Sequence, residues 1–339
     1  MKEKKYTDIK IETLPESRVK ITGEVEATHF EKARLAVIKN ATETAELPGF
    51  RTGKAPQSMV ESHLGEAKIL QQAAEAVLNE IYGDILDEHK VRAIGMPMIA
   101  ITKIAKGNPL GFSLETSVMP EITLENYKKL ATEAMKAIPE APTSVEEKDI
   151  EKIVEDLRKH FAEDAEKKEL PEVNEEFVKK LGDFATVADF KKKIGENLLE
   201  QKKHETKDKK RASIADKLVA ESQFEVPELI IESELNTMLG QFRADIERNG
   251  MTFDGYLKQI NKTESDIQKE WRESAIKRAK LELILKHIAR KEKIEPKAED
   301  IKKEVDHIMA HHNTHDRFKA RMYVENSMIN QMVFEFLEG

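Results

Sequence analysis

The sequence of 339 residues contains no cysteine, which excludes disulfide bonds and thiolate metal sites. Aromatic residues make up only 6% of the chain, and the net charge of -8 argues against general nucleic-acid binding. We find no run that approaches the ~18 apolar residues of a membrane span. The first ten residues, MKEKKYTDIK, lack the apolar stretch of a signal peptide. These absences predict a soluble, cytoplasmic chain, and its length favours more than one domain.

One short loop is the most informative part of the chain. Residues 48–56 read PGFRTGKAP, and two Gly and two Pro in nine residues disfavour any regular helix or strand. Phe50, Arg51 and Lys54 place one large apolar ring and two cations in this loop. Loop chemistry alone leaves two interpretations open, an ordinary turn between helices and a surface built for contact.

A phosphate-binding loop of the Walker A type is excluded by spacing. That motif needs four residues between its first Gly and the Gly-Lys pair, followed by Ser or Thr. Here three residues separate Gly49 from Gly53, and Ala55 follows the lysine.

The loop closely resembles the Gly-Phe-Arg-x-Gly-Lys-x-Pro signature of the trigger factor family, bacterial chaperones that dock at the ribosomal exit tunnel. The matching residues are Gly49, Phe50, Arg51, Gly53, Lys54 and Pro56. Many members carry Lys directly after the Arg, where this chain has Thr52, so one expected cation is missing. The resemblance implies a ribosome-binding loop formed by Gly49, Phe50, Arg51, Thr52, Gly53 and Lys54. It also implies two partners, the large ribosomal subunit at the tunnel exit (protein and rRNA) and unfolded nascent polypeptides. It suggests homodimers away from the ribosome.

The predicted fold class is α+β, with a small amino-terminal α+β domain over residues 1–119. Period-two alternation predicts strands with one buried face, and these are expected around residues 9–11, 19–25, 98–104 and 112–118. A helical stripe is formed by Ile69, Ala73, Ala76, Val77, Ile81 and Ile85. The signature loop should therefore lie between two helices, away from the sheet.

Residues 120–144 are predicted to be a connector, punctuated by three prolines, with an extended piece near 130–138. Residues 145–339 are predicted to form an elongated all-α domain with helical arms. Pro227 and Pro296 mark helix starts, and Thr263 is expected to cap a helix that runs to about Lys293. Residues 201–211 are polar all round, which predicts either a surface helix or the stalk of a helical arm.

Most trigger factors insert an FKBP-like prolyl isomerase domain into this region. Residues 149–161 resemble the helix before that domain, and residues 170–182 resemble the segment after it. Only about eight residues lie between them, whereas such a barrel needs roughly 80 or more. We therefore expect the isomerase domain to be absent, together with any catalytic residue or cofactor.

Two further residue sets leave alternatives open. Methionine suits surfaces that accept many partners, so the predicted client-binding set is Met238, Phe242, Met309, Met322, Met328 and Met332. For any single member, burial in a helix core is the favoured interpretation. His307, His311 and His315 have the i, i+4, i+8 spacing that can bind Zn²⁺ or Ni²⁺, but Asn313-Thr314 favours a helix end there. Exposed histidines at a helix end, without metal, are expected.

The sequence thus predicts an ATP-independent chaperone that docks at the ribosomal exit tunnel and shields nascent chains. One alternative is an active prolyl isomerase, and another is a holdase or assembly factor that acts without ribosomes.

Overall fold

The computed structural model describes residues 5–45, 47–48, 50–164, 170–311 and 316–339. Contacts divide the chain into two compact units. Unit 1 comprises residues 1–123 and 223–280, and unit 2 comprises residues 124–222 and 281–339. Among the described helices, not one combines the length and the apolar character that a membrane crossing requires. The small amino-terminal sheet and the mainly helical remainder confirm the predicted α+β class.

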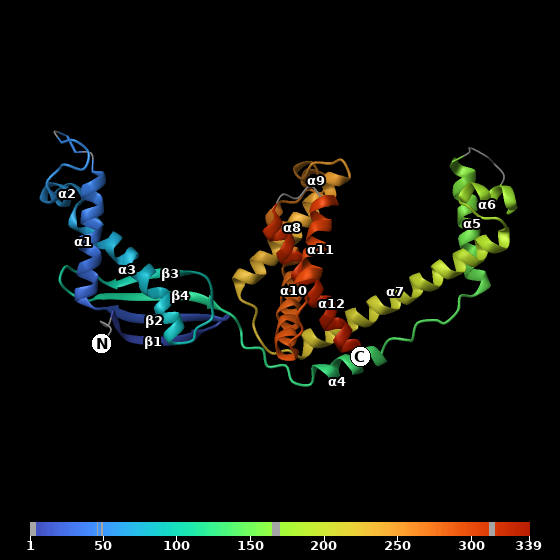
Figure 1. The fold of residues 1–339 in the computed structure, drawn as a ribbon, viewed down its shortest axis with the longest axis horizontal. Helices are drawn as coiled ribbons and strands as arrows, with labels where there is room; N and C mark the ends of the chain where they lie inside the picture. The colour runs from blue at the N-terminus through green and yellow to red at the C-terminus, as the bar shows by residue number, and fades with distance from the viewer. Residues whose placement is uncertain (1–4, 46, 49, 165–169, 312–315) are drawn as a thin grey trace. The chain divides into compact units, whose positions relative to one another are not determined.

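The amino-terminal part of unit 1 is a four-stranded antiparallel sheet in the order β1-β2-β4-β3 (Figure 1). Its strands are β1 (Tyr6–Leu14), β2 (Arg18–Val25), β3 (Ala93–Lys103) and β4 (Leu110–Val118). All four expected strands are present. In register, Ile21 of β2 lies beside Leu114 of β4, and both side chains are fully buried. Period-two alternation had predicted this buried face.

Two helices supply the other half of this core. They are α1 (Ala27–Thr44) and α3 (Glu66–Glu88). The predicted stripe of α3 is confirmed at Ile69, Ala73, Val77, Ile81 and Ile85, which are all buried. Ala76, however, is exposed, and Ala74 and Leu78 are buried instead. At about 100° per residue, the buried positions centre on the side of the helix between Ala73 and Ala74, and Ala76 lies about 120° from that centre.

The rest of unit 1 is helical. It contains α8 (Glu228–Arg248), α9 (Phe253–Gln259) and the first part of α10 (Glu264–Glu292). The start of α10 confirms the predicted cap, because the Thr263 hydroxyl accepts a hydrogen bond from the Asp266 amide at 3.2 Å. The Asp266 carboxylate in turn accepts one from the Thr263 amide at 3.0 Å.

Every secondary-structure element described in unit 2 is a helix. Its helices are α4 (Tyr127–Lys136), α5 (Glu147–Asp164), α6 (Glu175–Leu181), α7 (Val187–Glu221), the end of α10, α11 (Ala298–His311) and α12 (Arg317–Glu338). The prediction of an extended piece near 130–138 was wrong, because α4 occupies most of it. Tyr127, Ala131 and Ala134 are spaced i, i+4, i+7 and all are buried. Tertiary burial of this stripe, together with the high helix propensity of Ala, favours the helix.

The polar stretch 201–211 lies within the 35-residue helix α7. Ion pairs on this stretch hold it against other parts of unit 2. Lys202 pairs with Asp149 at 2.5 Å, and Lys210 pairs with Glu140 at 2.8 Å. Arg211 pairs with Glu338 through two parallel contacts, at 2.6 and 3.2 Å. Over these turns, the three ion pairs connect α7 to other parts of unit 2, so an apolar stripe is not needed there.

Candidate functional site: the loop between α1 and α2

The signature loop connects the end of α1 to α2 (Gln57–Leu64). Figure 1 shows it at the end of α1 that points away from the sheet. Helix α1 has 18 residues, which places its two ends roughly 27 Å apart at 1.5 Å per residue. The α1 helix thus holds the loop well clear of the domain core.

A small apolar cluster fixes the base of the loop. Leu47, Ala55 and Val60 are buried, with 8%, 5% and 1% of their surfaces exposed, and they pack with Ala41 and Leu64. Residues on both sides of the tip therefore contribute to one cluster. The tip is held at both ends, which reduces the conformational freedom that a partner would otherwise have to remove.

Backbone hydrogen bonds give the loop its shape. The Phe50 amide donates to the Leu47 carbonyl at 3.0 Å, the Lys54 amide to the Arg51 carbonyl at 2.9 Å, and the Gly53 amide to the Ala45 carbonyl at 3.3 Å. Gly53 has φ +74°, and a Cβ at this position would lie 2.8 Å from the Glu43 carbonyl oxygen. Both the left-handed backbone and the close approach require glycine here.

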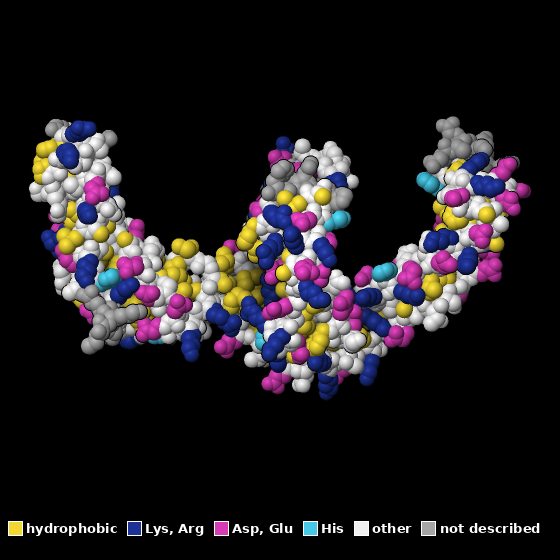
Figure 2. Space-filling model, viewed as in Figure 1, with side chains coloured by type: hydrophobic (Ala, Val, Ile, Leu, Met, Phe, Trp, Pro, Cys, Tyr) yellow, Lys and Arg dark blue, Asp and Glu magenta, His cyan; other side chains and the backbone are white. Residues whose placement is uncertain are grey.

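The tip exposes the side chains that the sequence singled out. Phe50 is 38% exposed, although large apolar rings are usually covered. Arg51, Thr52 and Lys54 are also exposed or partly exposed, and Figure 2 shows Lys and Arg side chains gathered at the outer end of α1 and α2. Gly49 lies outside the described residues. Within the described part of the chain, neither Arg51 nor Lys54 forms an ion pair, so both cations are available to an anionic partner.

In the first half of α1, Glu31 and Arg34 form an ion pair. Arg34 donates to both carboxylate oxygens of Glu31, at 2.8 to 3.1 Å. The hydrogen bond from Arg34 lowers the pKa of the Glu31 carboxyl, and the same bond raises the pKa of Arg34. Arg34 is buried, so this cation supports α1, in contrast to the exposed cations at the tip.

The predicted client-binding residues occupy two regions. Met238 and Phe242 lie on α8 in unit 1, and Phe242 packs edge-on against Trp271 with ring centroids 5.1 Å apart. Met309 and Met328 are brought together in unit 2, where both are partly buried against a cluster that includes Val305. The last two members, Met322 and Met332, lie on α12, and Met322 is 51% exposed while Met332 is half-buried.

Sequence reasoning missed two exposed methionines of strand β3, and the client-binding set leaves out two exposed aromatic side chains of α12. On the edge strand β3, Met96 is 84% exposed and Met98 is 75% exposed. On α12, Phe318 is 72% exposed and Tyr323 is 66% exposed. Pro97, which stands between the two methionines, is a residue typical of edge strands and offered a signal for the first pair.

Much of the predicted histidine cluster lies outside the described residues. Helix α11 ends at His311, close to the predicted end, while His312 and His315 lie outside the described residues. Over the described ranges, no three His, Asp or Glu side chains converge as a metal-binding group.

The structure thus combines an α+β domain, whose loop is held by a buried base, with long helices that carry exposed apolar side chains. Two family models match the chain: "Bacterial trigger factor protein (TF)" over residues 7–157, and "Bacterial trigger factor protein (TF) C-terminus" over residues 186–338. Together they match most of the sequence, and the chain belongs to the trigger factor family, a family of chaperones.

Curated relatives agree with this assignment. The chain is 26% identical to the trigger factor of Caldicellulosiruptor bescii, with 97% of this chain and 96% of the relative covered. It is 26% identical to that of Bacillus cytotoxicus, with 86% and 88% covered. The first alignment spans 420 positions, more than the 339 residues of this chain, so the relative contains residues that have no counterpart here.

The fold is also similar to a solved structure of a trigger factor chaperone, described as "Promiscuous Substrate Recognition in Folding and Assembly Activities of the Trigger Factor Chaperone". The two chains have a TM-score of 0.59 and are 17% identical, and the match covers 98% of this chain and 99% of the other. This structural similarity supports the assignment of the fold.

Proposed function

We propose that this protein is an ATP-independent, cytoplasmic chaperone that tethers itself to the large ribosomal subunit at the tunnel exit and shields nascent chains. The observation that carries the proposal is the loop between α1 and α2, where Phe50, Arg51 and Lys54 are exposed above a buried base. An exposed ring beside two unpaired cations suits a surface that combines an apolar patch with phosphates or carboxylates. Ribosomal protein and rRNA at the tunnel exit offer that combination.

The tether should be moderately weak. Thr52 stands where many relatives carry a lysine, so electrostatic attraction to rRNA rests on Arg51 and Lys54. Contacts to phosphates weaken as salt rises, because bound counterions are released on association. A chaperone that must leave the ribosome and return to it gains from such readily reversible binding.

Client binding is assigned to exposed apolar side chains of the helices. We retain the set Met238, Phe242, Met309, Met322, Met328 and Met332 as candidates. Among them, Met322 combines high exposure with exposed neighbours on α12, namely Phe318 and Tyr323. Shallow contacts of this kind bind many sequences weakly, so a client's own folding can release it. Away from the ribosome, the proposed state is a homodimer.

We further propose that the chain is not an enzyme. The two family matches leave residues 158–185 between them, and α5 and α6 occupy much of that interval. A prolyl isomerase barrel with a catalytic pocket needs roughly 80 or more residues. The domains proposed are therefore a ribosome-binding part over 1–119, a connector over 120–144 and a helical chaperone part over 145–339.

Co-sedimentation with ribosomes tests the tether. The triple variant Phe50→Ala, Arg51→Ala, Thr52→Ala should lose ribosome binding, while its thermal unfolding stays unchanged because these side chains lie outside the buried base. A matched control is Met96→Ala combined with Lys106→Ala, which removes an exposed apolar group and an exposed cation elsewhere in the same domain. Unchanged sedimentation of the triple variant would refute the tether.

Two further outcomes identify the alternatives. Accelerated isomerisation of a proline peptide by rigorously purified protein would support the alternative that the chain is an active prolyl isomerase. If the native protein fails to sediment with ribosomes but still suppresses aggregation, it is a free holdase or assembly factor.

A further inference from the structure

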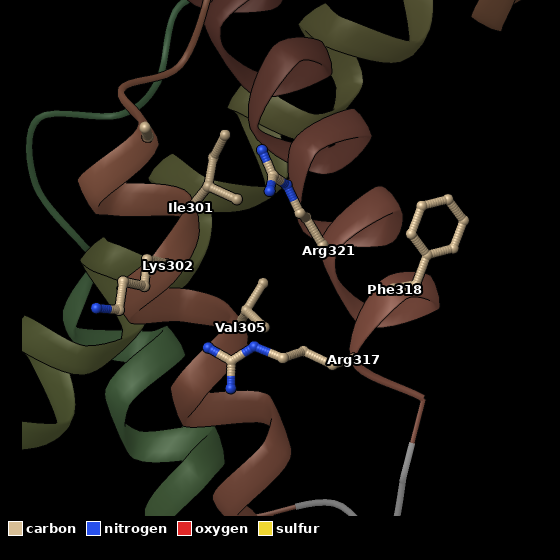
Figure 3. Close-up of a pocket in the computed structure, with 7 residues that line it drawn as sticks. Ile301, Lys302, Val305, Arg317, Phe318 and Arg321 are labelled. Atoms are coloured by element: carbon tan, nitrogen blue, oxygen red, sulfur yellow. The ribbon is translucent and has the colours of Figure 1, made fainter.

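The groove between α11 and α12 has an apolar floor and a cationic rim (Figure 3). Ile301 and Val305 of α11 form the floor and are buried, with 6% and 3% of their surfaces exposed. Figure 3 shows the side chains of Arg317 and Arg321 extending from α12 toward α11, above this floor. The groove encloses about 450 Å³, within the range of roughly 300–1,000 Å³ that is common for ligand sites.

The charge of this groove is opposite to that of the whole chain. The described residues that line it include the cations Lys302, Arg317 and Arg321 and no carboxylate, whereas the net charge of the protein is -8. Arg317 pairs with Asp306 at 2.6 Å. Within the described residues, Arg321 forms no ion pair or side-chain hydrogen bond, so its guanidinium can receive an external anion.

An apolar extension adjoins the cations. Phe318 also lines the groove and is 72% exposed, and Figure 3 shows its ring directed away from α11. A chain that crosses α12 can therefore contact the arginines and then the ring. A small inorganic anion would use the arginines alone and leave Phe318 uncovered.

We propose that this groove binds unfolded client segments in which carboxylates alternate with large aliphatic or aromatic side chains. The planar guanidinium fork matches the geometry of a carboxylate, while Ile301, Val305 and Phe318 accept the neighbouring apolar groups. The inference rests on the proposed chaperone function, and it adds a chemical preference to it. The net negative charge of the protein repels acidic client segments from the rest of its surface. A cationic groove therefore widens the range of client sequences that the protein can bind.

The test is a titration of the full chain with a dye-labelled peptide in which Glu alternates with Leu and Phe. A peptide with Gln at every Glu position serves as the uncharged comparison. The native protein should bind the acidic peptide roughly three- to tenfold more tightly at low salt, the range expected for two exposed charge contacts. Salt should reduce this difference. Chemical-shift changes should centre on the backbone amides of α11 and α12.

Double variants measure how much the two arginines contribute to binding of the acidic peptide. Arg317→Gln combined with Arg321→Gln should bind both peptides equally weakly. The control, Lys303→Gln combined with Lys319→Gln, removes two positive charges from the same helices at exposed positions outside the groove and should bind like the native protein. Arg317→Lys combined with Arg321→Lys keeps the charge without the planar fork and should be intermediate. Thermal unfolding confirms that each variant is folded.

Several results would overturn the proposal. Equal affinity of native protein for the two peptides, or equal losses in the arginine and control variants, would remove the charge preference. Tighter, saturable binding of laurate at the same amides would assign the groove to a lipid-like anion instead. Suppression of client aggregation is measured separately. If suppression persists while the peptide preference is absent, this inference fails and the proposed function stands. If suppression is absent altogether, the proposed function fails.

Discussion

At the scale of single residues, the loop between α1 and α2 depends on the buried residues at its base as well as on the exposed residues at its tip. The Gly, Phe, Arg and Lys of the tip were recognisable in the sequence, because their types and spacing are unusual for a turn. The roles of Leu47, Ala55 and Val60 were not, since three apolar residues at positions 47, 55 and 60 follow no helical or strand period. Only the folded structure brings them into one cluster.

Gly53 provides a sharp test of this arrangement. Gly53→Ala should reshape the loop and weaken ribosome binding, because alanine at φ +74° costs about 1–2 kcal/mol and its methyl group would also meet the Glu43 carbonyl. Ribosome co-sedimentation and thermal unfolding together report the effect. Gly107→Ala is the matched control, because Gly107 has the same φ of +74° but no atom within 4 Å of the place its methyl group would take. Equal loss of stability in the two variants, with ribosome binding intact in both, would show that the close contact is unimportant.

At the scale of elements, the helices and strands were predictable wherever a local signal marked their ends. Thr263 and Asp266 form the reciprocal cap of α10, and the alternation of Val19 and Ile21 matches β2. Helix α4 was missed because Pro120, Pro139 and Pro142 flank it on both sides and favour an extended connector. The decisive feature was burial of Ala131 and Ala134, which depends on distant residues.

The groove between α11 and α12 was missed for a related reason. Arg317 and Arg321 share one side of a helix by their i, i+4 spacing, which the sequence displays. Their floor, however, comes from Ile301 and Val305 on the preceding helix. Pairing of the two helices, rather than any motif, creates the site.

Helix α4 is also fastened to the end of α10, and this contact should respond to pH. The Tyr127 hydroxyl donates a hydrogen bond to the Glu292 carboxylate. Burial, followed by the bond to Glu292, raises the pKa of Tyr127 from 10.0 to about 12. Because the folded-state pKa lies above the unfolded value, this stabilisation is fully present below about pH 10 and should be lost as pH rises toward about 12.

Phenolate absorbance during an alkaline titration measures this effect. Tyr127→Phe should remove one late-titrating phenol, and Glu292→Gln should shift the same phenol to lower pH while keeping the tyrosine. Tyr6 is an internal comparison in the other unit, since its pKa is also raised to about 12 by burial and by its bond to Glu88. If the difference between the native trace and the Tyr127→Phe trace develops near pH 10 instead of near pH 12, the contact does not exist in solution.

At the scale of the whole molecule, the proposed tether and the proposed client contacts lie in different parts of the chain. The tether consists of residues 49–54, and the exposed apolar side chains of α12 lie in unit 2. Residues 223–280 group with the amino-terminal domain, although the sequence places them among the carboxyl-terminal helices. Helix α4 ends before residue 145 but belongs to unit 2, so a fragment that begins near residue 145 would lack it. Tests of client binding need the full chain.

The full chain allows the two roles to be separated by substitution. The triple loop variant should suppress aggregation of a refolding client, without ATP, as well as the native protein does, because its helices are intact. Phe318→Ser combined with Met322→Ser should weaken suppression, since each shallow apolar contact contributes about 1 kcal/mol or a factor of about five in affinity. Light scattering at several ratios of chaperone to client measures both effects. Met96→Ser combined with Met98→Ser removes two highly exposed apolar side chains from strand β3 and serves as the control. If the β3 pair abolishes suppression while the α12 pair leaves it unchanged, clients bind the sheet, and the helices are structural.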